Sequence, residues 1–216
     1  MLLTRRRFNL GLAAGAVAIT QFSPIAFVSQ AFAQVSMDDL MAKGPLDEMS
    51  LGDANAPVTI IEYASMTCGH CARFHREVFP KLKEQYIDTG KVHFILREFP
   101  LDPLAAGGFM LARCAGNDLY FPMVDVLFEK QADWIKTNDP VTALFNLVRQ
   151  AGFTKESFDS CLSNQQLLDG INEVKSRAAD KFGVDSTPTF FVNGQKANGV
   201  QSIEELGKLI DPYLKS

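Results

Sequence analysis

The stretch VTIIEYASMTCGHC, residues 58–71, decides the fold of this chain because it runs from an apolar strand into a pair of cysteines. Residues 58–63 are mostly apolar or β-branched, which is typical of a buried strand. Residues 72–86 carry apolar side chains at helical spacing. The sequence therefore predicts a strand that leads directly into a helix, with Cys68 and Cys71 at the junction.

The position of the two thiols at the start of a helix gives them different expected properties. The first turn of a helix has unpaired amide donors and a partial positive charge, which favour a thiolate over a thiol. We therefore expect a lowered pKa at Cys68, which makes it the reactive sulfur and a good leaving group. Cys71, one turn inside the helix, is expected to be the shielded resolving thiol. His70 lies between them and can stabilise the Cys68 thiolate, which would make the disulfide more oxidising.

A metal site is the alternative interpretation of this C-x-x-C motif. Cys68, Cys71 and His75 could offer three ligands, but structural zinc sites normally use four. The two remaining cysteines lie far away and singly. The strand and helix around the motif favour redox chemistry, which needs neither a metal nor an organic cofactor. His75 is then expected to be a solvated or half-packed helix residue.

The amino terminus, residues 1–33, has the features of a cleaved export signal. Arginines at positions 5–7 precede a short apolar core at 10–19, and Ala-Phe-Ala at 31–33 fits a cleavage site. Residues 4–8 (TRRRF) also resemble the twin-arginine signal, so the twin-arginine (Tat) and general secretory (Sec) routes both remain open. An uncleaved anchor is the other possibility. Each alternative places the domain in an oxidising compartment, where protein disulfides persist.

The charge and length of the expected mature chain limit its function. Removal of residues 1–33 leaves 183 residues, with 18 basic against 25 acidic side chains and a formal charge of −7. This length suits one domain with an insertion. An acidic protein without a basic stripe is a poor nucleic-acid binder, so we expect no nucleic-acid partner.

The rest of the chain divides into an arm, an α/β domain and a helical insertion. Residues 34–55 predict a leader arm or short helix, and residues 56–216 the domain. Within it, residues 91–100 predict a second strand, parallel to the first. Helical patterns then fill the region from about 101 to 170, which we interpret as an inserted helical subdomain.

Thr187 and Pro188 precede a predicted hairpin of strands at 189–192 and 196–200, which a last helix follows. A proline at the start of a strand is permitted because its missing donor costs little there. With these elements the chain resembles the thioredoxin fold, and more closely the DsbA-like disulfide oxidoreductases of the bacterial periplasm. The resemblance implies an α/β, thioredoxin-like fold with an inserted helical subdomain. It also implies a cis proline at 188 beside the C-x-x-C motif.

The resemblance assigns roles to individual residues. It implies that Cys68 is the nucleophile, Cys71 the resolving cysteine and His70 the residue that tunes Cys68. Thr187 and Pro188 resemble the backbone that pairs with an extended substrate segment and holds its cysteine near the active site.

Glu62, six residues before Cys68, matches the family's buried acid that relays protons to or from Cys71. An edge or outward-facing glutamate is the alternative for this position.

Two positions depart from the best-known pattern of this family. Gly69 stands where that pattern has proline, and Thr187 where it has valine. Both departures are similar to disulfide isomerases, so an isomerase or reductase on the same fold is an alternative function. Residues 34–55 are too few for the dimerisation domain of the periplasmic isomerases.

Cys114 and Cys161 both fall in the predicted insertion. The close C-x-x-C pair favours the pairing that joins these two as a structural disulfide. Two separately buried thiols are the alternative.

These observations predict a periplasmic thiol:disulfide oxidoreductase that introduces disulfides into exported proteins through Cys68 and Cys71. Its expected partners are unfolded exported proteins with free cysteines and, for recharging, a membrane disulfide oxidase. An isomerase or reductase is the nearer alternative, and a non-enzymatic periplasmic metal-binding protein is the more distant one.

Overall fold

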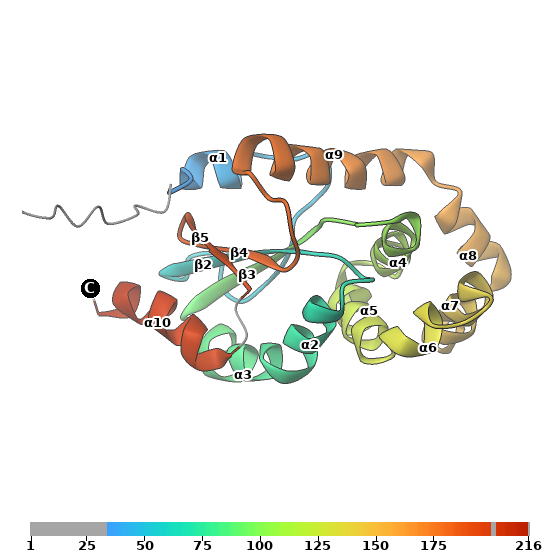
Figure 1. The fold of residues 1–216 in the computed structure, drawn as a ribbon, viewed down its shortest axis with the longest axis horizontal. Coiled ribbons are helices and arrows are strands. Elements are labelled where there is room, and N and C mark those ends of the chain that lie inside the picture. Colours follow the sequence, from blue (N-terminus) through green and yellow to red (C-terminus); the bar gives the residue numbers. More distant parts are fainter. Residues whose placement is uncertain (1–33, 200–201, 216) are drawn as a thin grey trace, which may run out of the picture. The chain divides into compact units, whose positions relative to one another are not determined.

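The computed structural model describes residues 34–199 and 202–215, so the expected export signal at 1–33 lies outside the described residues. The described chain contains a five-stranded sheet with the strand order β1-β3-β2-β4-β5. Helices lie on both faces of this sheet, and further helices are inserted between β3 and β4 (Figure 1). The α/β class and the inserted helices agree with the prediction.

The central strand is β2 (Val58–Ala64), the apolar run that precedes the cysteines. It pairs in parallel with β3 (Val92–Glu98) and antiparallel with β4 (Thr189–Val192). A tight turn then joins β4 to the edge strand β5 (Gln195–Asn198). The turn residues Asn193 and Gly194 have φ of 45° and 86°, the left-handed backbone that a two-residue hairpin of this kind requires.

The amino-terminal segment contributes more than the expected arm. It contains α1 (Met37–Met41) and the strand β1 (Met49–Leu51), which pairs antiparallel with β3 and forms the other edge of the sheet. A strand of three residues is too short to show an alternating pattern, so the sequence did not predict it.

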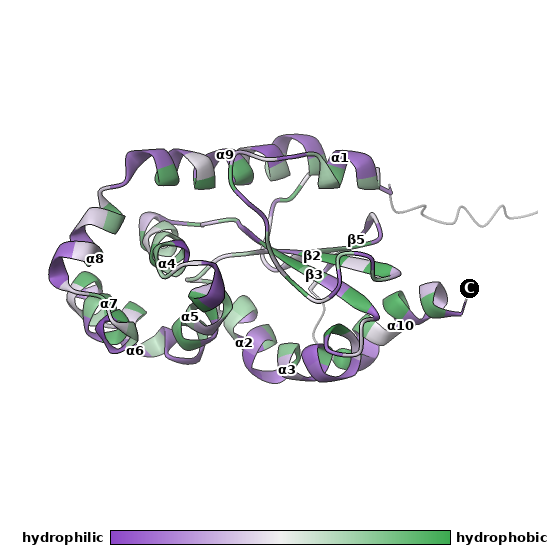
Figure 2. Cartoon of the chain, turned by 180° about the vertical axis from the view of Figure 1, so that it is seen from behind, coloured by the Kyte–Doolittle hydropathy of each residue, from purple (hydrophilic) through white to green (hydrophobic). Residues whose placement is uncertain are grey.

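One face of the sheet is covered by α1 and by the long helix α9 (Gln165–Phe182) (Figure 1). Ile61 and Tyr63 of β2 point to this face and pack with Leu40 and Phe182 of the two helices. The inner strands β2 and β3 are largely apolar, whereas α9 alternates between polar and apolar residues (Figure 2). The alternation is typical of a helix that lies between the core and solvent.

The other face carries Ile60, Glu62 and Ala64 of β2, and the helices that cover it follow the cysteines. These helices are α2 (Gly69–Glu77), α3 (Phe79–Leu82), a π-helical turn (Lys83–Ile87) and α10 (Ile203–Leu214).

The single helix predicted over 72–86 is therefore interrupted. Pro80 occupies the first turn of α3, where its missing amide donor needs no partner, and a new helix begins there.

The insertion consists of short helices with defined caps. They are α4 (Pro103–Cys114), α5 (Asn117–Glu129), α6 (Gln131–Ile135), α7 (Pro140–Val148), a 3₁₀ turn (Arg149–Ala151) and α8 (Lys155–Leu162). The side chains of Asp102 and Asp139 accept hydrogen bonds from the first turns of α4 and α7, at 2.8 and 3.0 Å.

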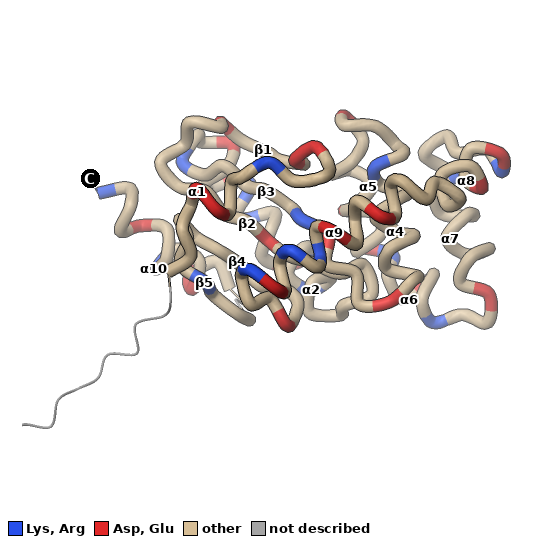
Figure 3. The backbone as a smooth tube through the Cα atoms, turned by 90° about the horizontal axis from the view of Figure 1, so that it is seen from above, with Lys and Arg blue, Asp and Glu red and all other residues tan. Residues whose placement is uncertain are grey.

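Within the described residues, every helix is too short or too polar to cross a membrane. Acidic and basic residues are interspersed along this part of the chain (Figure 3).

Candidate active site

Cys68 lies at the point where the loop after β2 enters helix α2. It is the N-cap residue, with the extended backbone angles φ −78° and ψ 118°, and its Sγ accepts a hydrogen bond from the Cys71 amide at 3.5 Å. Cys68 is 9 % exposed, whereas Cys71 is fully buried one turn further along. Both are free thiols in this structure. Cys68 is thus the less buried of the two thiols, and Cys71 is shielded from solvent.

The loop before β4 lies directly beside this pair. Because Tyr63 near the end of β2 pairs with Thr189 at the start of β4, the segment that precedes β4 reaches the amino-terminal end of α2. The Thr187–Pro188 peptide bond is cis, and the Cys68 thiol lies 3.2 Å from the Thr187 carbonyl oxygen. The structure therefore brings Thr187 and Pro188 next to Cys68.

The environment lowers the pKa of the Cys68 thiol from 9.0 to about 5. The hydrogen bond from the Cys71 thiol is the largest cause; burial opposes it, and the amides of His70 and Cys71 add to the lowering of this pKa. Hydrogen bonds to a sulfur favour its charged form. Cys68 is therefore predominantly a thiolate at neutral pH.

The pKa of the Cys71 thiol is raised well above 9.0. Burial is the main cause, followed by the hydrogen bond that Cys71 gives to Cys68 and by the negative charge of Glu62. Two neighbouring titratable groups whose environments separate their pKa values have different roles in proton transfer. Cys71 keeps its proton under conditions where Cys68 has lost its own.

His70 lies on the exposed side of the first turn of α2. Its Nδ1 is 3.3 Å from Nη2 of Arg73, one turn along the helix. The backbone amide of His70 contributes to the low pKa of Cys68. A role for the imidazole itself in tuning Cys68 stays a prediction.

Glu62 is fully buried on the face of β2 that α2 covers, so the alternative of an outward-facing glutamate is wrong. Its Oε2 lies 3.0 Å from Nε2 of His75.

His75 is itself only 5 % exposed, so the expectation of a solvated or half-packed residue is also wrong. Its ring stacks on the Phe128 ring, with 4.5 Å between the two centroids, and the centroid of the Phe79 ring is 4.9 Å away. Burial lowers the pKa of His75, but the carboxylates of Glu62 and Asp125 outweigh it and raise this pKa to about 9. The sequence did contain a signal, since a glutamate in a buried strand requires a partner.

The described residues contain no group of three or more His, Cys, Asp or Glu side chains arranged to hold a metal ion. The third ligand considered for a zinc site, His75, instead faces Glu62.

A pocket of about 300 Å³ lies beside the cysteines, between α2 and the loop before β4. Its lining includes His70, Arg73, Phe74, Val78, Thr187 and Pro188. The sequence analysis found several of these residues but not the pocket, because it forms only when α2 and this loop pack together.

Gln131, at the start of α6, fastens the insertion to the active-site loop. Its side-chain amide donates to the carbonyl oxygens of Met66 and Cys68, at 2.9 and 3.0 Å. The sequence analysis did not identify this residue, because a single glutamine between two helices has no distinctive pattern.

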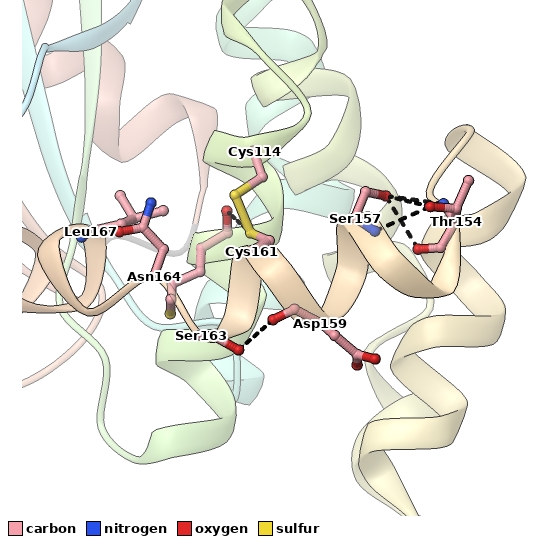
Figure 4. The surroundings of a disulfide bond; sticks show 9 residues. Cys114, Thr154, Ser157, Asp159, Cys161, Ser163, Asn164 and Leu167 are labelled. Carbon is pink, nitrogen blue, oxygen red and sulfur yellow. Dashed lines mark hydrogen bonds between the residues drawn. A yellow bond between two sulfur atoms is a disulfide. The ribbon is translucent and has the colours of Figure 1, made fainter.

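The two remaining cysteines are joined within the insertion. Figure 4 shows the Cys114–Cys161 disulfide between the end of α4 and helix α8, whose first turn is capped by Thr154 and Ser157. The two Cα atoms are 6.2 Å apart, and the bond closes a sequence separation of 47 residues. Cys161 is buried and Cys114 is exposed. The four cysteines thus form two separate pairs.

Comparison with known proteins agrees with this architecture. The thioredoxin family model matches residues 46–212. The crystal structure of alpha-DsbA1 from Wolbachia pipientis is similar, with a TM-score of 0.76 and 35 % identity, over 82 % of this chain and 96 % of that one.

Two relatives extend the comparison. A Rickettsia bellii protein named "Putative protein-disulfide oxidoreductase" is 33 % identical over 172 residues, which cover 78 % of this chain and 65 % of that protein. This chain thus spans somewhat less than two thirds of that relative's length. "Probable disulfide bond formation protein D" from Bacillus anthracis is 30 % identical over 179 residues, which cover 78 % of this chain and 79 % of that protein. With its thiol pair at the start of α2, the cis proline beside it and these relatives, the chain belongs to the DsbA-like branch of the thioredoxin family.

Proposed function

We propose that this chain is a thiol:disulfide oxidoreductase that donates the Cys68–Cys71 disulfide to exported proteins with free cysteines. The observation that carries the proposal is the opposite shift of the two thiol pKa values, downward at Cys68 and upward at Cys71. A stabilised Cys68 thiolate favours the reduced enzyme, and the disulfide is then a strong oxidant. The names of the relatives agree with this chemistry.

The exchange proceeds in two steps. A client thiolate attacks Sγ of Cys68 in the oxidised enzyme, the bond between the two enzyme sulfurs breaks, and Cys71 takes up a proton. A second client thiolate then attacks the client sulfur of the mixed disulfide, and Cys68 leaves as a thiolate. Two electrons pass from the client to the enzyme. The client thiols release two protons in all and Cys71 takes up one, so one proton is released to solvent in the net reaction. Sulfur carries the electrons, so these steps use no cofactor.

The client binds at the loop before β4. An extended client segment pairs with the main chain at Thr187, which holds its cysteine beside Cys68, and the neighbouring pocket takes adjacent side chains. Such pairing reads the main chain more than the side chains, which suits an enzyme with many unfolded clients. The enzyme acts in the periplasm after Sec or Tat export, and a membrane disulfide oxidase recharges it.

The low pKa of Cys68 makes the disulfide a strong oxidant, which an oxidase requires. An isomerase instead acts from the reduced state, so the two functions differ in the state in which the cysteine pair is kept. The redox state of Cys68 and Cys71, trapped in cells by alkylation, separates the two functions. A mainly oxidised pair is expected, and a mainly reduced pair would contradict the proposal.

The activity is tested with the oxidised protein and a reduced, unfolded client. We expect Cys68→Ser to abolish client oxidation and Cys71→Ser to accumulate a mixed disulfide through Cys68. Cys114→Ser is the matched control, since it replaces a cysteine of the separate disulfide outside the site and should retain the activity. Client oxidation by the Cys68→Ser protein would refute the mechanism.

A further inference from the structure

Glu62 and His75 are two buried titratable side chains on the face that carries Cys71, and the exchange steps of the proposed function use neither of them. Glu62 is fully buried in β2, and its Oε2 lies 3.0 Å from Nε2 of His75, whose side chain is 1 % exposed. A buried ion pair costs desolvation energy and is often no more stabilising than apolar residues of the same volume. A role beyond stability therefore has to be sought for this pair.

The register of the strand and the helix places the pair under the resolving thiol. Glu62 lies between Ile60 and Ala64 on the face of β2 that packs against α2. Cys71 and His75 are four residues apart on α2, so they lie one turn apart on the same helix face. After burial and the contact with Cys68, the charge of Glu62 is a further cause of the high pKa of Cys71.

Each member of the ion pair has one polar side-chain atom that makes no hydrogen bond in the part of the chain that the structure describes. Oε1 of Glu62 and Nδ1 of His75 are both buried and, within the described residues, have no hydrogen-bond partner. Most buried polar atoms in proteins are hydrogen-bonded, so two exceptions at the ends of one ion pair require an explanation. The two residues thus form a short chain of groups that can carry a proton, with Oε1 of Glu62 and Nδ1 of His75 available to exchange a proton with further groups.

The His75 end of this chain reaches solvent. Nδ1 of His75 lies 3.9 Å from Oδ1 of Asp125 on α5, and the Asp125 side chain is 54 % exposed. Both residues line a pocket of about 370 Å³ between α2, α3 and α5, which shares no lining residue with the pocket beside Cys68. The charged or titratable groups around His75 are Glu62 from β2, Arg76 from α2, Lys83 from the π-helical turn, and Asp125 and Glu129 from α5.

We propose that Glu62, His75 and Asp125 form a proton path between Cys71 and this second pocket, with His75 as the relay. The inference rests on the proposed function and adds the route by which the proton of Cys71 is exchanged with solvent. His75 acts through Glu62 and is a positioning and relay residue. Client and proton thus use different sides of α2.

The proton balance of the path follows the exchange steps. When the client attacks Cys68, the departing Cys71 sulfur accepts a proton from Glu62, which receives one from protonated His75. Oε1 of Glu62 has no hydrogen-bond partner among the residues that the structure describes, so it is the oxygen available to pass the proton on to Cys71. The proton that His75 gives up leaves from Nε2, so neutral His75 keeps the proton on Nδ1. A half-turn of the ring then brings the bare Nε2 to the Asp125 side, where it takes up a proton from solvent. Recharging runs the same path backwards, because Cys71 must then lose its proton.

Chemical rescue tests the path. His75→Ala removes the ring and leaves a space open to the second pocket. Oxidation of a reduced, unfolded client in a single turnover at about pH 7 should slow by roughly 10- to 100-fold, the range for loss of a positioned proton donor. Added imidazole should restore the rate in proportion to its protonated fraction. Thiazole, a ring of the same shape that carries almost no proton at this pH, should not.

Equal rescue by both rings would assign His75 a purely space-filling role and overturn the inference. An unchanged rate, or rescue by neither ring, would also overturn it.

A surface variant tests the same path without opening the core. Asp125 helps to raise the pKa of His75, so Asp125→Asn should lower this pKa, which NMR titration of the ring measures. The rate of client oxidation should fall at alkaline pH as His75 loses its proton, and in this variant the fall should occur at lower pH. Glu129→Gln is the matched control, since it removes a carboxylate from the same pocket one turn along α5 and should keep the original profile. Identical profiles for the two variants would refute the path.

The Cys68→Ser protein distinguishes failure of the proposed function from failure of the proton path. If Cys68→Ser still oxidises the client, the proposed function fails. If only Cys68→Ser is inactive and all His75 and Asp125 variants behave as the unmodified protein, the function stands and the proton path fails.

Discussion

The low pKa of Cys68 predicts that the reduced protein loses stability as the pH falls from neutral toward 5. The folded-state pKa is about 5, below the value of 9.0 for an unperturbed thiol. A lowered pKa stabilises the folded state above the unfolded pKa, and this contribution disappears as the pH falls through the folded pKa. Taking 1.36 kcal/mol per pKa unit, the contribution is about 2.7 kcal/mol at pH 7 and about 0.4 kcal/mol at pH 5.

The assay compares urea unfolding of the reduced protein with that of reduced Cys68→Ser. The difference in unfolding free energy between the two should increase by about 2 kcal/mol between pH 5 and pH 7. This is an upper value, because Cys68 keeps some contact with solvent. The contributions of the other titratable groups cancel in this difference, because both proteins contain them.

A difference that stays constant over this pH range would refute the reasoning, because the Cys68 thiolate would then contribute nothing to the folded state. A positive result has a redox consequence. The oxidised protein has no thiolate to stabilise, so the same free energy at pH 7 makes the disulfide more oxidising by roughly 60 mV.

Three further predictions concern groups around the site. Cys114→Ser should lower the unfolding free energy by up to about 4 kcal/mol, the loop-closure value for a separation of 47 residues, and keep client oxidation; an unchanged denaturant midpoint would contradict this. Gln131→Ala should lower the unfolding free energy by about 1 kcal/mol for each lost hydrogen bond. It should also slow client oxidation, because the Cys68 loop loses its two anchors, and the rise in activation free energy should exceed the loss of stability. An unaltered rate would show that the loop needs neither hydrogen bond. Gly194→Ala should lower the unfolding free energy measured in urea by more than about 1 kcal/mol, because φ is 86° and the new Cβ would clash with the Val35 carbonyl oxygen; a cost near zero would exclude this contact.

The parts of the site that could be predicted from the sequence are those encoded locally. The strand before Cys68, the helix after it and the Thr187–Pro188 pair are short patterns with direct structural meaning. The sheet then brings the two segments together, because β2 and β4 are neighbours. The central part of the site thus follows from two local patterns and one strand pairing.

The parts that could not be predicted depend on contacts between distant segments. His75 is buried because α5 of the insertion supplies Phe128 against its ring, and no pattern in residues 72–86 indicates that helix. The anchor from Gln131 likewise exists only because α6 reaches back to the active-site loop. Sequence periodicity shows which side of a helix is apolar, but not which charged residue on that side finds a buried partner.

The central place of β2 in the sheet has a mechanical consequence. Cys68 follows the strand that is hydrogen-bonded along both edges, to β3 and to β4. In the proposed mechanism, a client that begins to fold while it is covalently attached would pull on this strand, and two rows of hydrogen bonds would share the load. Strands held in this way open only with the whole domain, so the pull acts on the most resistant part of the molecule. The position of β2 would therefore allow the domain to resist the tension of client folding without unfolding.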